Sequence, residues 1–362
     1  MSGGMELYLH MPFCVRKCAY CDFLSFPSGA KTQRMYAKRL MEDIGVMGKR
    51  YGEIPVETIF IGGGTPSVPD SALIVEIMEH VRHAFHVADG AEISMEANPG
   101  TVTREKLTDY RKAGINRLSF GLQSANDREL KLLGRIHTWA EFLESFTLAR
   151  ECGFANLNID LMSALPGQTC ESWKETLSRV TDLDPEHISA YSLIIEEGTP
   201  FGERYGSEEG RKLLPDEDSE REMYHETKRF LKDCGYERYE ISNYAKPGRE
   251  CRHNIGYWTG VPYLGLGLGA SSYLDGCRFT VNPDMKQYLE EKPGMFADIE
   301  KLTKKDMEEE FFYVGLRMTA GVSLSEFERR FGISAKEVYP GLMETFVKEK
   351  AARFEGDRFV LT

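Results

Sequence analysis

Three cysteines close together near the start of the chain constrain its chemistry more than any other feature. Cys14, Cys18 and Cys21 follow a short apolar run in C-x3-C-x2-C spacing. Three thiolates on one tight loop can bind three irons of a [4Fe–4S] cube and leave the fourth iron open for a small molecule. The alternatives are structural cysteines or a zinc site, but a structural zinc site normally has four protein ligands. The spacing therefore predicts an iron–sulfur cluster.

The composition is that of an ordinary globular protein, with 362 residues, 41% of them hydrophobic and 28% charged. A net charge of −12 argues against a general role in nucleic-acid binding. The other five cysteines are scattered, which is typical of reduced cytosolic thiols rather than a disulfide framework. No signal peptide and no apolar run of membrane-spanning length is present. We therefore expect a cytoplasmic protein without a transmembrane segment.

Short β-rich runs alternate with amphipathic stretches over residues 1–198, a pattern that predicts an α/β fold with a parallel sheet. Six such units predict a partial (β/α)6 barrel, two units short of the full eight. A doubly wound open sheet is the alternative fold. The expected strands are 7–10, 58–61, 92–97, 117–121, 156–162 and 187–193, and the expected helices are 32–49, 71–85, 103–113, 139–151 and 171–181.

After residue 198 the pattern changes and predicts two further parts. We expect residues 199–299 to extend the sheet and to begin with an exposed, mobile, acidic connection at 202–222. Residues 300–362 predict a small helical or winged-helix-like C-terminal subdomain. The additional strands are expected at 236–244, 263–274 and 278–281.

Most expected strands end in residues that suit ligand binding. In parallel α/β folds the carboxyl ends of the strands carry the chemistry. The first strand leads into the cysteines, and the second ends in Gly62-Gly63-Gly64-Thr65-Pro66. Glycines let a backbone come close to a ligand, although they can also simply form a turn. The later strands end near Glu96, Gln123, Asp160 and Ser192, so polar groups are expected to converge on one rim.

The cysteine motif and the Gly-Gly-Gly-Thr-Pro motif resemble those of the radical S-adenosylmethionine (SAM) family. The resemblance implies a [4Fe–4S] cluster whose open iron chelates SAM and whose electron cleaves it to a 5′-deoxyadenosyl radical. It also favours the (β/α)6 barrel over the doubly wound sheet. The residues that it implies as SAM contacts are Tyr8, Tyr20, Gly63, Gly64, Thr65, Glu96, Gln123, Arg135, Asp160 and Ser192.

Several of these residue types suit the implied ligand on chemical grounds. The carboxylates of Glu96 and Asp160 can accept hydrogen bonds from ribose hydroxyls or an amino group. Arg135 can pair bidentately with a carboxylate. Each of these residues alone is more often a surface or capping residue, and an aromatic such as Tyr20 is often plain packing. Together, on consecutive units, they predict one site.

Two further motifs distinguish branches of the family. The branch that resembles this chain holds the oxygen-independent coproporphyrinogen III dehydrogenases and the HemW heme chaperones. The dehydrogenases have a fourth cysteine two residues after the third, where this chain has Phe23. His253, Asn254, Tyr257 and Trp258 match the H-N-x-x-Y-W motif of the HemW branch. An imidazole can ligate heme iron and aromatic rings offer flat apolar faces, so these four residues are heme-site candidates; the alternative is a capped histidine beside core aromatics.

The sequence therefore predicts a heme chaperone of the HemW type, which binds a cluster and SAM and delivers heme to client apoproteins. The expected partners are heme, heme-requiring apoproteins and a reducing electron donor. The alternative is a coproporphyrinogen III dehydrogenase, which decarboxylates two propionates to give protoporphyrinogen IX. A radical SAM enzyme with an unrelated substrate is the third possibility, since one fold serves many functions. No residue is assigned as catalytic, and the sequence leaves open whether the chain is an enzyme.

Overall fold

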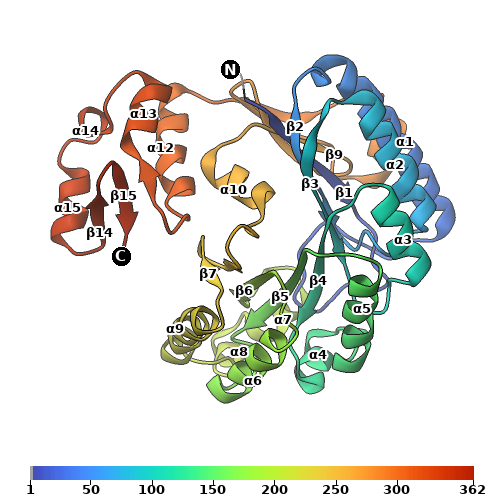
Figure 1. Cartoon of the computed structure of the whole chain (residues 1–362), viewed down its shortest axis with the longest axis horizontal. Helices are drawn as coiled ribbons and strands as arrows, with labels where there is room; N and C mark the ends of the chain where they lie inside the picture. Colours follow the sequence, from blue (N-terminus) through green and yellow to red (C-terminus); the bar gives the residue numbers. More distant parts are fainter. Residues whose placement is uncertain (1–2) are drawn as a thin grey trace.

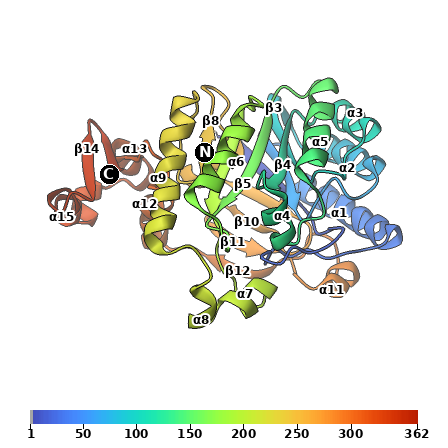
Figure 2. The same cartoon turned by 90° about the horizontal axis from the view of Figure 1, so that it is seen from below.

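Residues 3–362 are described by the computed structural model. Six parallel strands lie side by side in the order of the chain, from β1 to β6, with helices packed on their outer face (Figures 1 and 2). This sequential order differs from a doubly wound sheet, whose strand order reverses, and it confirms the predicted open, partial barrel. The strands are Met5–Met11 (β1), Val56–Gly63 (β2), Val87–Ala97 (β3), Arg117–Gln123 (β4), Leu157–Ser163 (β5) and His187–Ser192 (β6).

The connecting helices begin at clear capping residues. Thr138 caps the helix that follows it through a capping box with Glu141, and Thr103 and Thr169 cap two others. These caps satisfy backbone N–H groups that would otherwise lack partners at each helix start. The helices are Ala30–Tyr51 (α1), Ser71–Ala84 (α2), Arg104–Lys112 (α3), Asp127–Leu133 (α4), Trp139–Glu151 (α5) and Cys170–Thr181 (α6). The sequence did not predict α4.

The two faces of the parallel strands differ in polarity. Side chains alternate along a strand, so Leu7 and Leu9 of β1 join the apolar core beneath the helices. Glu6, Tyr8 and His10 then belong to the opposite, inner face. The inner face of the barrel is therefore lined by polar groups, and this is where a site can form.

The chain beyond β6 adds strands to both edges of this sheet. Asn243–Ala245 (β8) pairs with β6, and Tyr263–Leu266 (β9) pairs parallel with β1. Within residues 3–362 the result is a 12-stranded sheet, as expected for a sheet extension, while the exact domain boundaries stay predictions. The other elements are Glu237–Arg238 (β7), Arg252–Thr259 (α10), Ser271–Leu274 (β10), Cys277–Thr280 (β11), Met285–Glu290 (α11) and Ala297–Lys301 (β12).

The segment 202–222 is largely exposed, as expected, but it is more regular than its turn-forming residues suggested, while its mobility stays a prediction. Most of that segment is helical, with Pro200–Tyr205 (α7), Glu208–Arg211 (α8) and the start of Glu217–Asp233 (α9). The helix α9 buries a narrow stripe formed by Met223, Thr227 and Leu231, and it packs against α6.

Residues 304–361 form a C-terminal unit with its own apolar core, built around Phe327 and Phe359. Its helices are Lys304–Gly315 (α12), Leu324–Phe331 (α13), Ala335–Val338 (α14) and Leu342–Lys348 (α15), and its three antiparallel strands are Val322–Ser323 (β13), Ala352–Glu355 (β14) and Arg358–Leu361 (β15). This helical unit with a small sheet agrees with the predicted winged-helix-like subdomain. Across the described part of the chain, no helix has the length and apolarity needed to cross a membrane.

Candidate functional site

The cysteine loop joins the end of β1 to α1 and is fixed at its base. The backbone N–H of Cys14 donates to the carbonyl of Phe26 at 3.2 Å, and that of Phe26 donates to Pro12 at 2.9 Å. The far side of the loop is tied to the end of α4, because the N–H of Ala19 donates to Leu133 at 3.0 Å. The loop therefore holds its three cysteines over the carboxyl ends of the strands. All three thiols are free and half-buried.

Three free thiols on one loop are the type of ligand set that a [4Fe–4S] cluster uses. Among residues 3–362, no three His, Cys, Asp or Glu side chains converge as ligands of one ion, whereas each cysteine of a cluster site binds a different iron. Thr65 Oγ1 lies 3.5 Å from Cys14 Sγ, and Arg135 Nη1 donates to Cys18 Sγ at 3.5 Å. Hydrogen bonds of this kind to the sulfurs tune the reduction potential of a cluster.

The glycine run after β2 is packed directly on the cysteine loop. The N–H groups of Gly64 and Thr65 donate to the carbonyls of Met11 and Phe13 at 2.8 and 2.7 Å. Gly63 has φ of +108°, and a Cβ there would lie 2.3 Å from the His10 ring. Only glycine fits that position. The structure thus explains these glycines by close contact between two loops, and it places Thr65 beside the thiols.

Two half-buried carboxyl groups lie on the parallel strands, Glu96 on β3 and Asp160 on β5. Glu96 accepts from the N–H of Gly63 at 3.0 Å, and Asp160 accepts from Ser119 Oγ at 3.0 Å and Asn158 Nδ2 at 2.7 Å. Burial, together with the neighbouring Asp160, raises the pKa of Glu96 to about 8, and burial also raises the pKa of Asp160. A cationic ligand placed between them would favour their ionised forms.

Arg135 connects the cysteines to the strand ends. Its Nη2 donates to Asn98 Oδ1 at 2.7 Å and to the carbonyl of Gly121, while Nε is buried without a partner. Asn98 in turn donates to Thr65 Oγ1 at 2.8 Å. Asn98 was not among the expected site residues, although its position between a strand end and Pro99 was a usable signal.

The remaining expected contacts lie along the same rim or on the inner face. Gln123 takes a positive φ of 76° and accepts a hydrogen bond from the Tyr191 hydroxyl at 2.9 Å. Ser192 Oγ lies 3.4 Å from Ser163 Oγ, and Tyr20 packs against Phe201 with ring centroids 6.5 Å apart. The Tyr8 hydroxyl contacts His10 Nδ1 at 2.9 Å, so it is satisfied within the protein.

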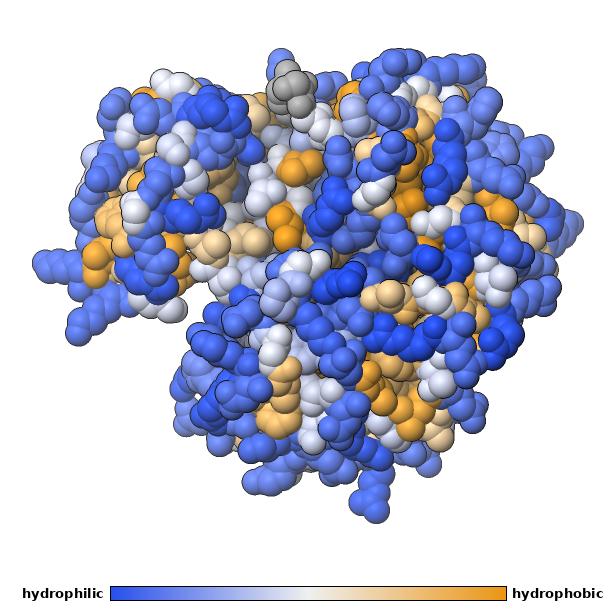
Figure 3. Space-filling model, viewed as in Figure 1, coloured by the Kyte–Doolittle hydropathy of each residue, from blue (hydrophilic) through white to orange (hydrophobic). Residues whose placement is uncertain are grey.

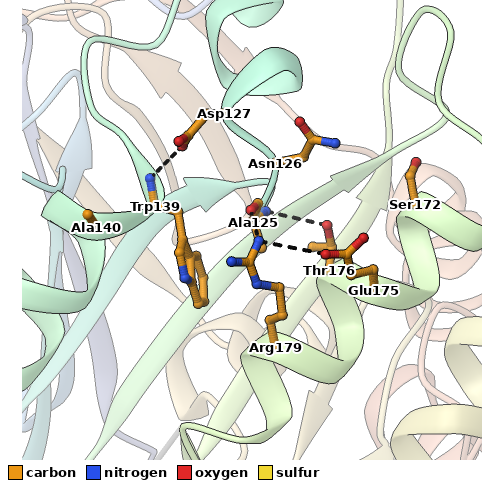
Figure 4. Close-up of a pocket in the computed structure, with 9 residues that line it drawn as sticks. All are labelled: Ala125, Asn126, Asp127, Trp139, Ala140, Ser172, Glu175, Thr176 and Arg179. Carbon is orange, nitrogen blue, oxygen red and sulfur yellow. Dashed lines mark hydrogen bonds and ion pairs between the residues drawn. The ribbon is translucent and has the colours of Figure 1, made fainter.

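A separate pocket of about 340 Å³ lies between the starts of α4 and α5 and the side of α6, and its lining residues are drawn in Figure 4. The Arg179 guanidinium lies 4.8 Å from the centroid of the Trp139 ring and donates to the carbonyl of Ala125 at 2.6 Å. None of the expected site residues lines this pocket. A smaller pocket does border the cysteine loop and includes Cys18, Thr65, Asn98 and Arg135 in its wall.

The H-N-x-x-Y-W segment lies at the opposite end of the barrel. It forms α10, and His253 of this helix contacts Thr58, near the start of β2, whereas Gly63 ends that strand. Gly63 is five residues after Thr58 along β2, which corresponds to a separation of roughly 16 Å. The heme-site candidates therefore form a floor beneath the barrel, and the expected SAM contacts lie at or towards its mouth.

His253 has no free ring nitrogen in this conformation. It is 1% exposed, with Nδ1 2.7 Å from Thr58 Oγ1 and Nε2 3.0 Å from the Tyr257 hydroxyl. Burial, with Arg117 nearby, lowers its pKa to about 3, so the imidazole is neutral. Trp258 and Asn254 are half-buried, and the Arg317 guanidinium lies 4.3 Å from the centroid of a Trp258 ring. Iron could bind a ring nitrogen of His253 only if the contact at that nitrogen were broken.

A buried carboxyl group supports α10 from inside the barrel. Glu6 is 2% exposed, its Oε2 has no hydrogen-bond partner, and a Cβ at Gly256 would lie 1.9 Å from its Oε1. Burial raises the pKa of Glu6 from 4.5 to about 8. The helix can seat this closely only because position 256 carries no side chain.

Replacing Glu6 with glutamine should flatten the pH dependence of stability. The unfolded chain releases the Glu6 proton near pH 4.5, whereas the folded chain holds it to about pH 8. The stabilisation is therefore complete below pH 4.5 and is lost as the pH rises towards 8. Between about pH 6.5 and 8, urea unfolding should show the wild type losing about 2 kcal/mol more than Glu6→Gln, since one pKa unit is worth about 1.4 kcal/mol. Equal losses of unfolding free energy in the wild type and in Glu6→Gln would contradict the raised pKa of Glu6.

Comparisons with known proteins agree with this geometry. Residues 8–180 match the model of the radical SAM superfamily, and residues 302–362 match that of the HemN C-terminal domain. Coproporphyrinogen III oxidase (HemN) from Escherichia coli, a radical SAM enzyme, superposes with a TM-score of 0.85 over all of this chain and 87% of that one. At 23% identity this likeness shows the fold. Together, fold and cysteine loop define a radical SAM-type protein.

Sequence relatives identify the branch. The chain is 36% identical to the heme chaperone HemW of Bacillus subtilis over 94% of its own length and 91% of that protein. It is likewise 36% identical to the heme chaperone HemW of Escherichia coli, over 95% and 90% of the two chains. The chain belongs to the HemW family of heme chaperones.

Proposed function

We propose that the protein holds a [4Fe–4S] cluster and SAM at the barrel mouth, and that it binds heme and delivers it to client apoproteins in the cytoplasm. The observation that carries the cofactor proposal is the loop of three free thiols held beside Thr65 and the buried guanidinium of Arg135. A cluster with one open iron supplies a binding point and an electron for SAM. Membership of the HemW family supports heme as the cargo.

The side chains at the mouth suit the charges of SAM. Arg135 offers a guanidinium with an unpartnered Nε for the ligand carboxylate. Glu96 and Asp160 are half-buried carboxyls that gain from a nearby cation, and the amino and sulfonium groups of SAM carry positive charge. Tyr8, Tyr20, the glycine run, Gln123 and Ser192 complete the proposed contacts. The role of these residues is to bind and orient, and none of them is assigned a proton transfer.

The proposed heme site uses His253 with Asn254, Tyr257 and Trp258. His253 is held neutral by burial, and the neutral imidazole is the form that ligates iron. Hydrophobic side chains lie in the hollow over α10, between the barrel and the C-terminal unit (Figure 3), where a flat apolar macrocycle could bind. His253 would ligate the iron only after one of its ring nitrogens had left its present partner.

A transfer experiment tests this function. The heme-loaded chain is mixed with the apo form of a b-type heme protein, and the Soret band of the acceptor is followed with time. In a parallel sample, a heme trap in the buffer measures how fast the chain releases heme by itself. Transfer to the acceptor that is faster than this spontaneous release would support delivery. A chain that binds no heme, or that releases it at the same rate with and without acceptor, would refute it.

A further inference from the structure

The contacts around His253 form a closed state that competes with heme. Each ring nitrogen is occupied, Nδ1 by Thr58 and Nε2 by Tyr257. The ring also stacks on Phe60, with centroids 5.3 Å apart and an interplanar angle of 26°. Thr58 and Phe60 are on β2, inside the barrel, so the side chain that iron would need is one of the groups that attach α10 to the barrel.

Two polar atoms in the floor beneath α10, Glu6 Oε2 and Arg117 Nε, are buried without hydrogen-bond partners. Other polar groups there are paired; Glu92 accepts from the backbone N–H of His253 at 3.3 Å and that of Arg252 at 3.1 Å. Buried unsatisfied groups cost stability that water would restore. Exposing this floor would therefore offset part of the packing lost when α10 moves away.

We propose that α10 is a latch: seated in the barrel floor it hides His253, and heme binds the conformation in which α10 has left the floor and the imidazole is free. This rests on the proposed function, because it takes heme iron as the ligand of His253. The apparent affinity for heme is then reduced by the small fraction of chains in the open state. A substitution that weakens the packing of α10 on the barrel floor, at a residue that does not contact heme, should raise the affinity for heme.

Thr58→Val is the direct test, because the change removes the hydroxyl that contacts His253 Nδ1 and keeps a side chain of similar size. Loss of a hydrogen bond of ordinary strength should raise the open fraction and the heme affinity about fivefold. The matched control is Thr227→Val on α9, which removes a different buried hydroxyl, one that accepts from the ring N–H of Trp173 at 2.8 Å. Heme titration of the control should match the wild type.

A second measurement needs no heme. Diethyl pyrocarbonate modifies accessible neutral imidazoles, and mass spectrometry of the peptide containing His253 reports its rate. The rate should be several-fold higher in Thr58→Val, and also in Gly256→Ala, whose added Cβ would lie 1.9 Å from Glu6 Oε1. If Thr58→Val does not fold, Gly256→Ala replaces it in both assays.

The outcomes separate the latch from the function beneath it. Higher affinity and faster modification in the weakened variants support the latch. If His253→Ala loses heme affinity while the weakened variants match the wild type, the latch is refuted and the heme site stands. If His253→Ala binds heme as tightly as the wild type while the weakened variants still modify faster, α10 opens but His253 is not the ligand, and the proposal fails at the heme site.

Discussion

Cys18→Ala should abolish the iron–sulfur cluster. A [4Fe–4S] cube with three protein ligands has none to spare, so two remaining thiolates leave two irons open to solvent. Cys18 also accepts the hydrogen bond from Arg135, so its loss removes the contact between the cluster loop and the guanidinium. After anaerobic reconstitution, iron content should fall from about four per chain to near zero.

The control for this variant is Cys234→Ala. Cys234 is an exposed, free cysteine at the end of α9, and its removal should leave iron content and absorbance unchanged. Far-ultraviolet circular dichroism of both variants checks that they fold. A folded Cys18→Ala chain that still holds four irons would show that the loop is not the cluster site.

Arg135→Gln should weaken SAM binding strongly. The guanidinium is buried and contacts Cys18, Asn98 and the carbonyl of Gly121, so the ligand carboxylate would lose a preorganised, desolvated partner. Removing one member of such a pair costs about 2–5 kcal/mol, which corresponds to roughly 30-fold or more in Kd. Isothermal titration of the reconstituted chain with SAM measures this.

Arg179→Gln is the matched control for Arg135→Gln. Arg179 also donates to a backbone carbonyl, that of Ala125 at 2.6 Å, but it belongs to the separate pocket of Figure 4. The Arg179→Gln variant should bind SAM with the same affinity as the wild type. Similar losses in the two variants would mean that Arg135 acts only through general stability, and an unchanged Kd in Arg135→Gln would remove it from the SAM site.

The barrel could be predicted because its units repeat a simple pattern. Each strand is a short β-rich run, and Trp139–Glu151 lies where the sequence placed it because a capping box starts it and an apolar face follows. The helix α9 was missed for the opposite reason. Its buried stripe is only Met223, Thr227 and Leu231 within an otherwise charged segment, and such a stripe is recognisable only once α6 is present to cover it.

The residues at the barrel mouth could be predicted better than the contacts around His253. Thr65 and Glu96 follow or end strands, and parallel topology brings strand ends together, so their position near the cysteines could be expected from the sequence, whereas Arg135 follows α4 and was expected there only from the family resemblance. The surroundings of His253 were not predictable, because Thr58 lies 195 positions away in sequence. The hydroxyl that each ring nitrogen of His253 contacts depends on how α10 packs against the barrel. No local sequence pattern encodes this packing.

The most direct test of the whole account is an anaerobic assay of the reconstituted chain with SAM and a reductant. Coproporphyrinogen III is offered in one sample and heme in another, and carbon dioxide release and heme retention are measured. The account predicts stable heme binding and no carbon dioxide. Conversion of coproporphyrinogen III with carbon dioxide release, and no retained heme, would contradict it and identify the chain as a decarboxylating enzyme.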